Sequence, residues 1–370
     1  MFMVMLLPLL STAQETNTKL IIGTYTQPGK SDGLYVYDFN SLTGEPLYKA
    51  MAPGIVNPSF LAISKDQKFV YAVNETGRET PGGVSSFEFD ARSGALKFLN
   101  KVKSMGDDPC YISIDNKGDH VFVGNYSGGN LSAFGVRPDG FLDDAMQVVQ
   151  HQGSGPDKSR QEKSHVHCTV ISPDQKYLMA VDLGTDQVTS YRIRKGKSPN
   201  ILTAKLPLLS VAPGSGPRHL TFHPNGKLAY LVHELTGDVS AYRYQKGNLT
   251  PIQTVSMLAA DFKGKIGAAD IHVSNDGKFL YASNRGDANE IVIYSINENG
   301  SLKLAGRNST LGKGPRNFAI DPSGRFLLVA NQNTNEVVIF SRDAGTGLLA
   351  DTGKRIQVGQ PVCLVFTSGN

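Results

Sequence analysis

The chain of 370 residues carries 37 basic and 33 acidic side chains, so its formal net charge is only +4. The basic residues form no continuous run, which argues against a nucleic-acid-binding protein. Tryptophan is absent, which excludes Trp-Asp repeats, and the three cysteines, Cys110, Cys168 and Cys363, are too widely spaced for a disulfide framework or a zinc ribbon. We therefore interpret the cysteines as buried free thiols.

The chain begins with an apolar segment. Residues 2–10 are predominantly apolar and are followed by Ser-Thr-Ala at positions 11–13, as in the hydrophobic region and cleavage site of a signal peptide. We predict that residues 1–13 are a signal peptide and that the protein is periplasmic or otherwise exported. A cytoplasmic protein is the alternative, because no Lys or Arg precedes the apolar run. The segment is too short to span a bilayer and no other segment is apolar enough, so we predict no membrane span.

From residue 19 onward the sequence is repetitive. The recurring unit is a Pro, a short apolar strand, a turn of the Ser/Asp-Pro-Asp-Gly-Lys type, a second apolar strand and an Asn. Six units match this pattern with equal internal length, at residues 58–74, 109–125, 166–182, 217–233, 268–284 and 315–331. Each unit continues with a third alternating strand, as at 188–191, 239–242 and 337–340, and with a Gly-x-Leu turn into a fourth strand. Four strands in a period of about 50 residues are typical of a propeller blade.

The seventh unit is split between the two ends of the chain. Residues 361–366 begin a repeat, but the chain stops before its second strand. Residues 20–25 match the second strands, and residues 34–37 match the third strands. We therefore predict an all-β fold: one domain, residues 19–370, forming a seven-bladed β-propeller. N-terminal strands complete its C-terminal blade and close the ring, which pairs edges that would otherwise be exposed.

This geometry places polar residues at one mouth of the central channel. The first and second strands form a hairpin, so the start of one and the end of the other lie on the face opposite the turn. His167 and Arg218 follow the start of a first strand, and Glu234 and Arg285 follow the end of a second strand. The repeats differ at these positions, whereas a packing role would recur in every blade. We predict that these four residues converge on one ligand; the alternative is that they are rim residues paired with one another.

Other kinds of site fit the sequence less well. Three histidines, His165, His219 and His272, could suggest a metal, but metal sites need clustered ligands with fixed spacing, and here arginines are interleaved and would repel a cation. We predict neither a metal nor another cofactor.

Six short stretches around the mouth carry a resemblance to a known family. They are His-Val-His-Cys at 165–168, Val-Asp-Leu-Gly-Thr-Asp at 181–186, Gly-Pro-Arg-His at 216–219, His-Glu-Leu at 233–235, Ser-Asn-Arg-Gly at 283–286 and Gly-Pro-Arg-Asn at 314–317. The chain resembles the lactonase family of seven-bladed propellers over nearly its whole length. Members of this family include the propeller-type bacterial 6-phosphogluconolactonase and the fungal carboxy-cis,cis-muconate cyclase.

The resemblance implies metal-independent lactone chemistry, with site residues at His167, Arg218, Glu234 and Arg285. Either Glu234 or His167 could act as the general base, while the two arginines would stabilise an oxyanion and bind an anionic group of the substrate. We expect substrate contacts from further residues around the mouth: His165, His219, Arg316, Asn331 and Glu75.

The expected reaction is hydrolysis of a small anionic sugar lactone, 6-phospho-D-glucono-1,5-lactone in the first place. The alternative is a non-enzymatic binding propeller of the periplasm or cell surface, because residues 326–331 resemble the repeats of such proteins. The sequence also has a longer interval between its second and third units, with the extra length at residues 150–164. This insert contains Arg160 and leads directly into His165, so we predict that it partly covers the site.

Overall fold

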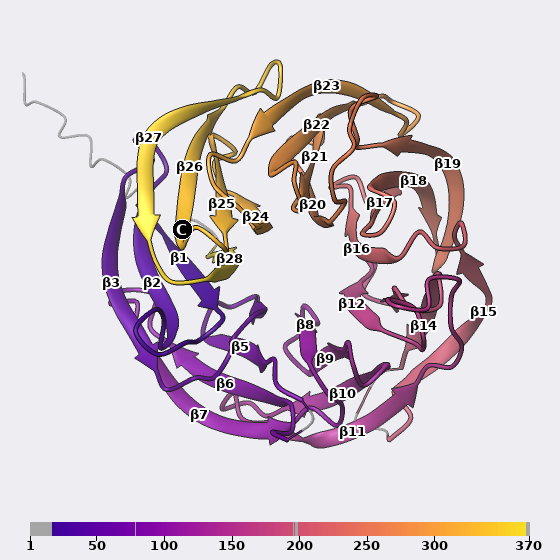
Figure 1. Cartoon of the computed structure of the whole chain (residues 1–370). Helices are drawn as coiled ribbons and strands as arrows, with labels where there is room; N and C mark the ends of the chain where they lie inside the picture. The colour runs from indigo at the N-terminus through magenta and orange to yellow at the C-terminus, as the bar shows by residue number, and fades with distance from the viewer. Residues whose placement is uncertain (1–16, 78, 195, 197–198, 368–370) are drawn as a thin grey trace, which may run out of the picture.

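The computed structural model describes residues 17–77, 79–194, 196 and 199–367, and Figure 1 shows them as a closed ring of sheets around a central opening. Residues 1–13 lie outside the described part of the chain, so the signal peptide and export stay predictions. Among the described residues, no helix is long and apolar enough to cross a bilayer.

The ring consists of seven four-stranded antiparallel sheets, which confirms the seven-bladed β-propeller. The first strand of each sheet lies innermost, around the channel: β4 (Leu61–Ile63), β8 (Pro109–Ile114), β12 (Val166–Ile171), β16 (Pro217–Phe222), β20 (Ala268–Val273), β24 (Pro315–Ile320) and β28 (Pro361–Phe366). The second strands are β5 (Phe69–Asn74), β9 (His120–Asn125), β13 (Tyr177–Asp182), β17 (Leu228–His233), β21 (Phe279–Asn284), β25 (Phe326–Asn331) and β1 (Asn17–Thr24).

The third and fourth strands complete each blade toward the rim. The third strands are β6 (Gly83–Phe89), β10 (Asn130–Val136), β14 (Gln187–Ile193), β18 (Asp238–Gln245), β22 (Glu290–Ile296), β26 (Glu336–Arg342) and β2 (Gly33–Asn40). The fourth strands, at the outer edge in Figure 1, are β7 (Leu96–Lys103), β11 (Leu142–Gln150), β15 (Leu202–Ser210), β19 (Asn248–Ser256), β23 (Leu302–Ser309), β27 (Leu349–Gln357) and β3 (Pro46–Pro53).

One inner strand is shorter than its repeat predicts. The strand β4 begins at Leu61 and not directly after Pro58, because the N–H of Ser59 donates to the carbonyl of Asn57 in a turn and is unavailable to the sheet. Asn57 has a φ of 43°, in the left-handed region. The turn leaves the side chain of Ser59 free to enter the channel mouth.

The hydrophobic core lies between neighbouring blades. The second strands are almost entirely buried, as in β9, β17, β21 and β25, since a blade packs against each of their faces. Three tyrosines on these strands, Tyr71, Tyr230 and Tyr281, reach across the interface between blades. Their hydroxyls donate to glycine carbonyls of the next blade at 3.3, 3.2 and 2.7 Å, so their burial leaves no polar atom unpaired.

The ring is closed by strand pairing between the two ends of the chain. The strand β28 pairs with β1, with Ile21 opposite Val365 and Ile22 opposite Leu364. The final sheet runs in the order β28-β1-β2-β3, as the split repeat predicts. Closure also brings Tyr25, the residue after β1, to the mouth of the channel.

Deleting residues 17–40 should abolish cooperative folding. The deletion removes β1 and β2, so that β28 and β3 lose their partners and the ring keeps an open, apolar gap. Differential scanning calorimetry should show no single unfolding transition. Deletion of residues 1–13 is the control and should leave the melting temperature unchanged. A cooperative transition in the longer deletion would contradict closure by the N-terminal strands.

Candidate functional site at the channel mouth

The inner strands carry β-bulges where the repeats become polar. In β8, β12, β16 and β24 the pairing with the second strand skips one residue, which leaves Cys110, His167, Arg218 and Arg316 without a partner in the ladder. A bulge bends the strand locally and re-aims a side chain. The same bulge is thus repeated around the channel, and it presents a cysteine in one blade, a histidine in another and an arginine in two.

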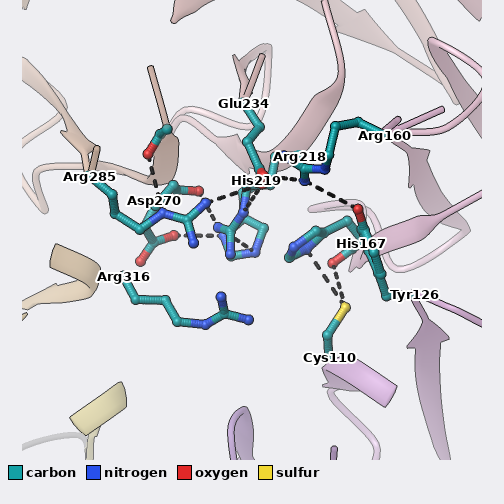
Figure 2. Close-up of polar contacts among 12 residues, drawn as sticks. Cys110, Tyr126, Arg160, His167, Arg218, His219, Glu234, Asp270, Arg285 and Arg316 are labelled. Atoms are coloured by element: carbon teal, nitrogen blue, oxygen red, sulfur yellow. Dashed lines mark hydrogen bonds and ion pairs between the residues drawn. The ribbon is translucent and has the colours of Figure 1, made fainter. Parts of the chain in front are cut away.

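A buried carboxylate, Glu234, gathers three arginines from separate parts of the chain (Figure 2). It follows β17 and is only 6% exposed. The ion-pair distances are 2.6 Å from Arg160 Nη2 to Oε1, 2.8 Å from Arg218 Nε to Oε2 and 3.3 Å from Arg285 Nη2 to Oε2. The N–H of Arg218 Nε does not point at the oxygen, so that contact is Coulombic and not a hydrogen bond.

The arginines control the charge state of Glu234. Burial by itself would raise the pKa of the carboxyl, but Arg285, Arg218 and Arg160 outweigh burial and lower the pKa to about 2. Burial lowers the pKa of Arg285 to about 10, and the group stays protonated at neutral pH. Glu234 is therefore a carboxylate under all ordinary conditions and a weak base.

The imidazole of His167 has a different environment. Its Nδ1 lies 3.7 Å from the sulfur of Cys110, and its ring stands edge-on to the rings of Tyr126 and His219, with centroids 5.4 and 5.2 Å away. Burial, and then the charges of Arg218 and His219, hold the pKa of His167 well below its usual value. His167 is therefore neutral at pH 7. Within the described residues, no side chain hydrogen-bonds to Nε2, the other ring nitrogen.

A second carboxylate, Glu75, lies across the mouth. The hydroxyl of Tyr25 donates to Oε1 at 2.7 Å, and the hydroxyl of Ser59 donates to Oε2. Arg316 Nη2 is 3.7 Å from Oε1, and its guanidinium lies 5.2 Å from the centroid of the Tyr25 ring. Tyr25 takes part only because the N-terminal strand closes the ring.

The channel is narrow at the level of the mouth arginines. Arg218 and Arg316, with Phe60, His219 and Asn317, help to line a neck of about 10 Å³, too small for a sugar-sized molecule. Farther along the inner strands the channel widens into a cavity of about 590 Å³, with His272 in its wall. A ligand at the arginines therefore enters and leaves on the mouth side.

The structure brings most of the predicted site residues together. Glu234 contacts Arg218 and Arg285, and His167 adjoins His219, whose Nε2 is 3.3 Å from Arg218 Nη1. The predicted insert also reaches the mouth, where Arg160 contacts Glu234.

Two predicted substrate contacts have other roles in the structure. Asn331 has no exposed surface, and its amide donates to the carbonyl of Thr310 at 2.9 Å, just as Asn74 and Asn125 bind the preceding linkers. It packs inside its blade, and its contact with the substrate stays a prediction. His165 is stacked on Tyr126 with centroids 4.4 Å apart, and both of its ring nitrogens have partners.

Sequence reasoning assigned no role to several residues of the mouth. Tyr25 and Tyr126 follow the second strands just as Glu234 does, Ser59 follows the Pro that opens its repeat, and Asp270 follows the start of β20. Their positions in the repeat could therefore have identified them as residues of the channel mouth. Arg160 has no counterpart in the other repeats with which to align it, and the extra length of its loop was the signal that pointed to the mouth.

One group of ligand-type side chains in the described residues lies close enough to hold a metal ion. It consists of Asp115, Asp119 and His120, at the turn between β8 and β9 on the face opposite the mouth. Asp115 already accepts a hydrogen bond from the His120 ring at 2.9 Å. The mouth histidines do not belong to this group.

The fold and the mouth define a closed seven-bladed propeller with an arginine-rich site at one end of its channel. Residues 19–366 match the family described as "Lactonase, 7-bladed beta-propeller", and the chain belongs to this family. It is 41% identical over 351 residues to a 6-phosphogluconolactonase of Formosa agariphila, covering 94% of this chain and 99% of the relative. A 6-phosphogluconolactonase of Bacillus subtilis is 36% identical, with 93% and 97% covered. The solved structure of a periplasmic gluconolactonase from Pseudomonas aeruginosa is 38% identical, with a TM-score of 0.91 over 96% of this chain and all (100%) of that one.

Replacing Glu234 by Gln should reduce stability in a pH-dependent way. The pKa of Glu234 is lower in the folded state, about 2, than in the unfolded chain, so the ionised carboxylate stabilises the fold above the unfolded pKa. This contribution, about 3 kcal/mol by linkage, is lost as the pH falls toward 2. Urea unfolding at pH 7 should therefore show wild type more stable than Glu234→Gln by about this amount, with a smaller difference below pH 4.

The matched control is Glu45→Gln. Glu45 also pairs with a basic side chain, Lys354, at 2.9 Å, but its side chain is 64% exposed. An exposed pair contributes little, so this variant should stay within about 0.5 kcal/mol of wild type at both pH values. Equal effects of the two substitutions would show that burial among arginines does not determine the contribution of Glu234.

Proposed function

We propose that this protein hydrolyses a sugar lactone that carries an anionic group, with 6-phospho-D-glucono-1,5-lactone as the first candidate, and that it does so without a metal. The observation that carries the proposal is the neutral imidazole of His167 beside arginines that Glu234 holds in place. The Formosa and Bacillus relatives, each a 6-phosphogluconolactonase, support it.

The charge of the mouth supports an anionic substrate. Four guanidinium groups, those of Arg160, Arg218, Arg285 and Arg316, share two carboxylates, those of Glu75 and Glu234. The excess of positive charge lies in a largely buried site, where charge interactions are stronger than in water. A phosphate or carboxylate on the lactone would offset this excess, and arginine is well suited to bind either group.

The chemistry needs a base, an oxyanion site and a proton donor. In the proposed mechanism His167 Nε2 takes a proton from water as the water oxygen adds to the lactone carbonyl carbon. Arg218 and Arg285 stabilise the resulting oxyanion. The ring C–O bond then breaks, and the departing alkoxide takes the proton from the His167 imidazolium, which regenerates the neutral base.

This mechanism gives Glu234 a role other than that of the base. A carboxylate with a pKa of about 2 is a poor proton acceptor near pH 7, and its oxygens are already occupied by arginines. Glu234 fixes the guanidinium groups so that little reorganisation is needed when the oxyanion forms. Of the two candidate bases that the sequence leaves open, the site therefore favours His167.

Replacing His167 by Asn should lower kcat for 6-phosphogluconolactone by roughly two to four orders of magnitude. The low pKa of His167 keeps the base neutral, so wild-type kcat should stay constant on acidification past the ordinary imidazole pKa of about 6.5 and fall only at lower pH. A continuous pH-stat assay, corrected for spontaneous opening of the lactone, measures both effects.

The same assay tests the proposed function itself. Glucono-1,5-lactone without phosphate should be a poorer substrate than its 6-phosphate, and turnover should survive dialysis against EDTA. If the purified wild type gives no turnover on either lactone but binds 6-phosphogluconate in calorimetry, the protein is a binding propeller and not a lactonase. If His167→Asn keeps more than about a third of wild-type kcat, His167 is not the base.

Arg160→Ala should act on substrate binding and not on folding. Arg160 lies on the insert loop and its side chain is 41% exposed, so its loss leaves no buried cavity. Removing one cation from the mouth should raise KM for the phosphorylated lactone by roughly tenfold, with little change in kcat, melting temperature or KM for the uncharged lactone. A large fall in melting temperature would mean that the loop serves stability instead.

A further inference from the structure

A second buried carboxylate, Asp270, lies behind Arg218, with the ring of His219 between them. It is on β20, is 2% exposed and accepts hydrogen bonds from three side chains. His219 Nδ1 is 2.8 Å from Oδ1, His272 Nε2 is 2.9 Å from Oδ2, and the amide of Asn317 also donates to Oδ2. The backbone N–H of Ile271 donates to Oδ1 at 2.9 Å. These donors hold Asp270 as a carboxylate, which can only accept hydrogen bonds.

The carboxylate determines the tautomer of His219. Because Asp270 only accepts, the proton of the neutral His219 ring lies on Nδ1, and Nε2 carries a lone pair. That lone pair is 3.3 Å from Arg218 Nη1, a permanent donor. Asp270 thus orients an acceptor toward Arg218 through the imidazole ring.

Arg218 is held on three sides as a result. Nη1 donates to the carbonyl of Ala269 and to His219, and Nε lies beside Glu234. Its side chain is about 1% exposed, so it has little freedom to turn. Among the described residues, no protein group accepts a hydrogen bond from Nη2, the remaining nitrogen. That nitrogen is left for a ligand.

We propose that Asp270 and His219 are positioning residues that orient Arg218, so that its free Nη2 donates to the oxyanion formed at the lactone carbonyl. This inference rests on the proposed function and adds a carboxylate-histidine-arginine chain to it (Figure 2). Neither Asp270 nor His219 exchanges a proton in the reaction. Both act by keeping Arg218 in place before the charge develops.

The structure supplies a matched control in His272. Its Nε2 bonds the same carboxylate as His219 does, at nearly the same length, but its side chain is 41% exposed in the channel cavity and has no contact with Arg218. His219→Asn and His272→Asn each remove one imidazole partner of Asp270. Only the first breaks the chain to Arg218.

The decisive experiment is a double-mutant cycle on lactone hydrolysis. We expect His219→Asn and Asp270→Asn each to lower kcat by roughly 10- to 100-fold with a smaller change in KM, whereas His272→Asn stays within about threefold of wild type. In an Arg218→Lys background, adding Asp270→Asn should cause no further loss, because the residue through which it acts has gone. Additive losses, or equal effects of the two histidine substitutions, would overturn the inference.

Two readouts separate a failure of this inference from a failure of the proposed function or of folding. Nitrogen-15 NMR of the wild type should show His219 protonated on Nδ1 and not on Nε2, and the opposite tautomer would overturn the inference even in an active enzyme. Isothermal titration calorimetry should show weaker binding of 6-phosphogluconate to His219→Asn but not to His272→Asn. This difference in affinity can be measured even if the protein does not turn over a lactone. If Asp270→Asn does not fold, the comparison of His219→Asn with His272→Asn still tests the inference.

Discussion

The structure depends on the pairing of β28 with β1. A propeller blade buries both faces of its inner strands only when a neighbour stands on each side, so an open ring would expose two apolar surfaces and two strand edges. Closure also fixes the radius of the channel. That radius sets how near the seven inner strands come to one another, and therefore whether side chains from different blades can touch. Tyr25 reaches Glu75 only because of this closure.

Within the closed ring, one backbone irregularity creates the site. The bulge after the first residue of an inner strand recurs in blade after blade, which is what a repeated packing solution would produce. The side chains at the bulge vary between blades: they are Cys110, His167 and two arginines. The fold therefore supplies a ring of equivalent positions, and sequence variation at His167, Arg218 and Arg316 turns one end of the channel into a site.

The site concentrates charge at a cost to stability. Moving several arginines and carboxylates out of water is expensive, and such clusters are seldom more stabilising than well-packed apolar residues. Here each buried carboxylate is saturated: Glu234 by three guanidinium groups, and Asp270 by three side chains and two backbone N–H groups. What this arrangement provides is a set of donors already oriented in the absence of substrate, which is the condition for electrostatic stabilisation of a transition state.

The sequence by itself determined the number of blades, the bounds of most inner hairpins and the closure by N-terminal strands. It also determined the face on which four site residues lie: His167, Arg218, Glu234 and Arg285. These features could be predicted because strand periodicity and turn residues are local properties that repeat. Only the tertiary structure decided which side chains meet. The contact of Arg160 with Glu234, the chain from Asp270 to Arg218, the buried role of Asn331 and the low pKa of Glu234 all arise between residues far apart in the sequence. The distances between side chains across a closed ring depend on how every blade packs. The desolvation that shifts a pKa depends on the same packing. Neither quantity can be predicted from a local sequence pattern.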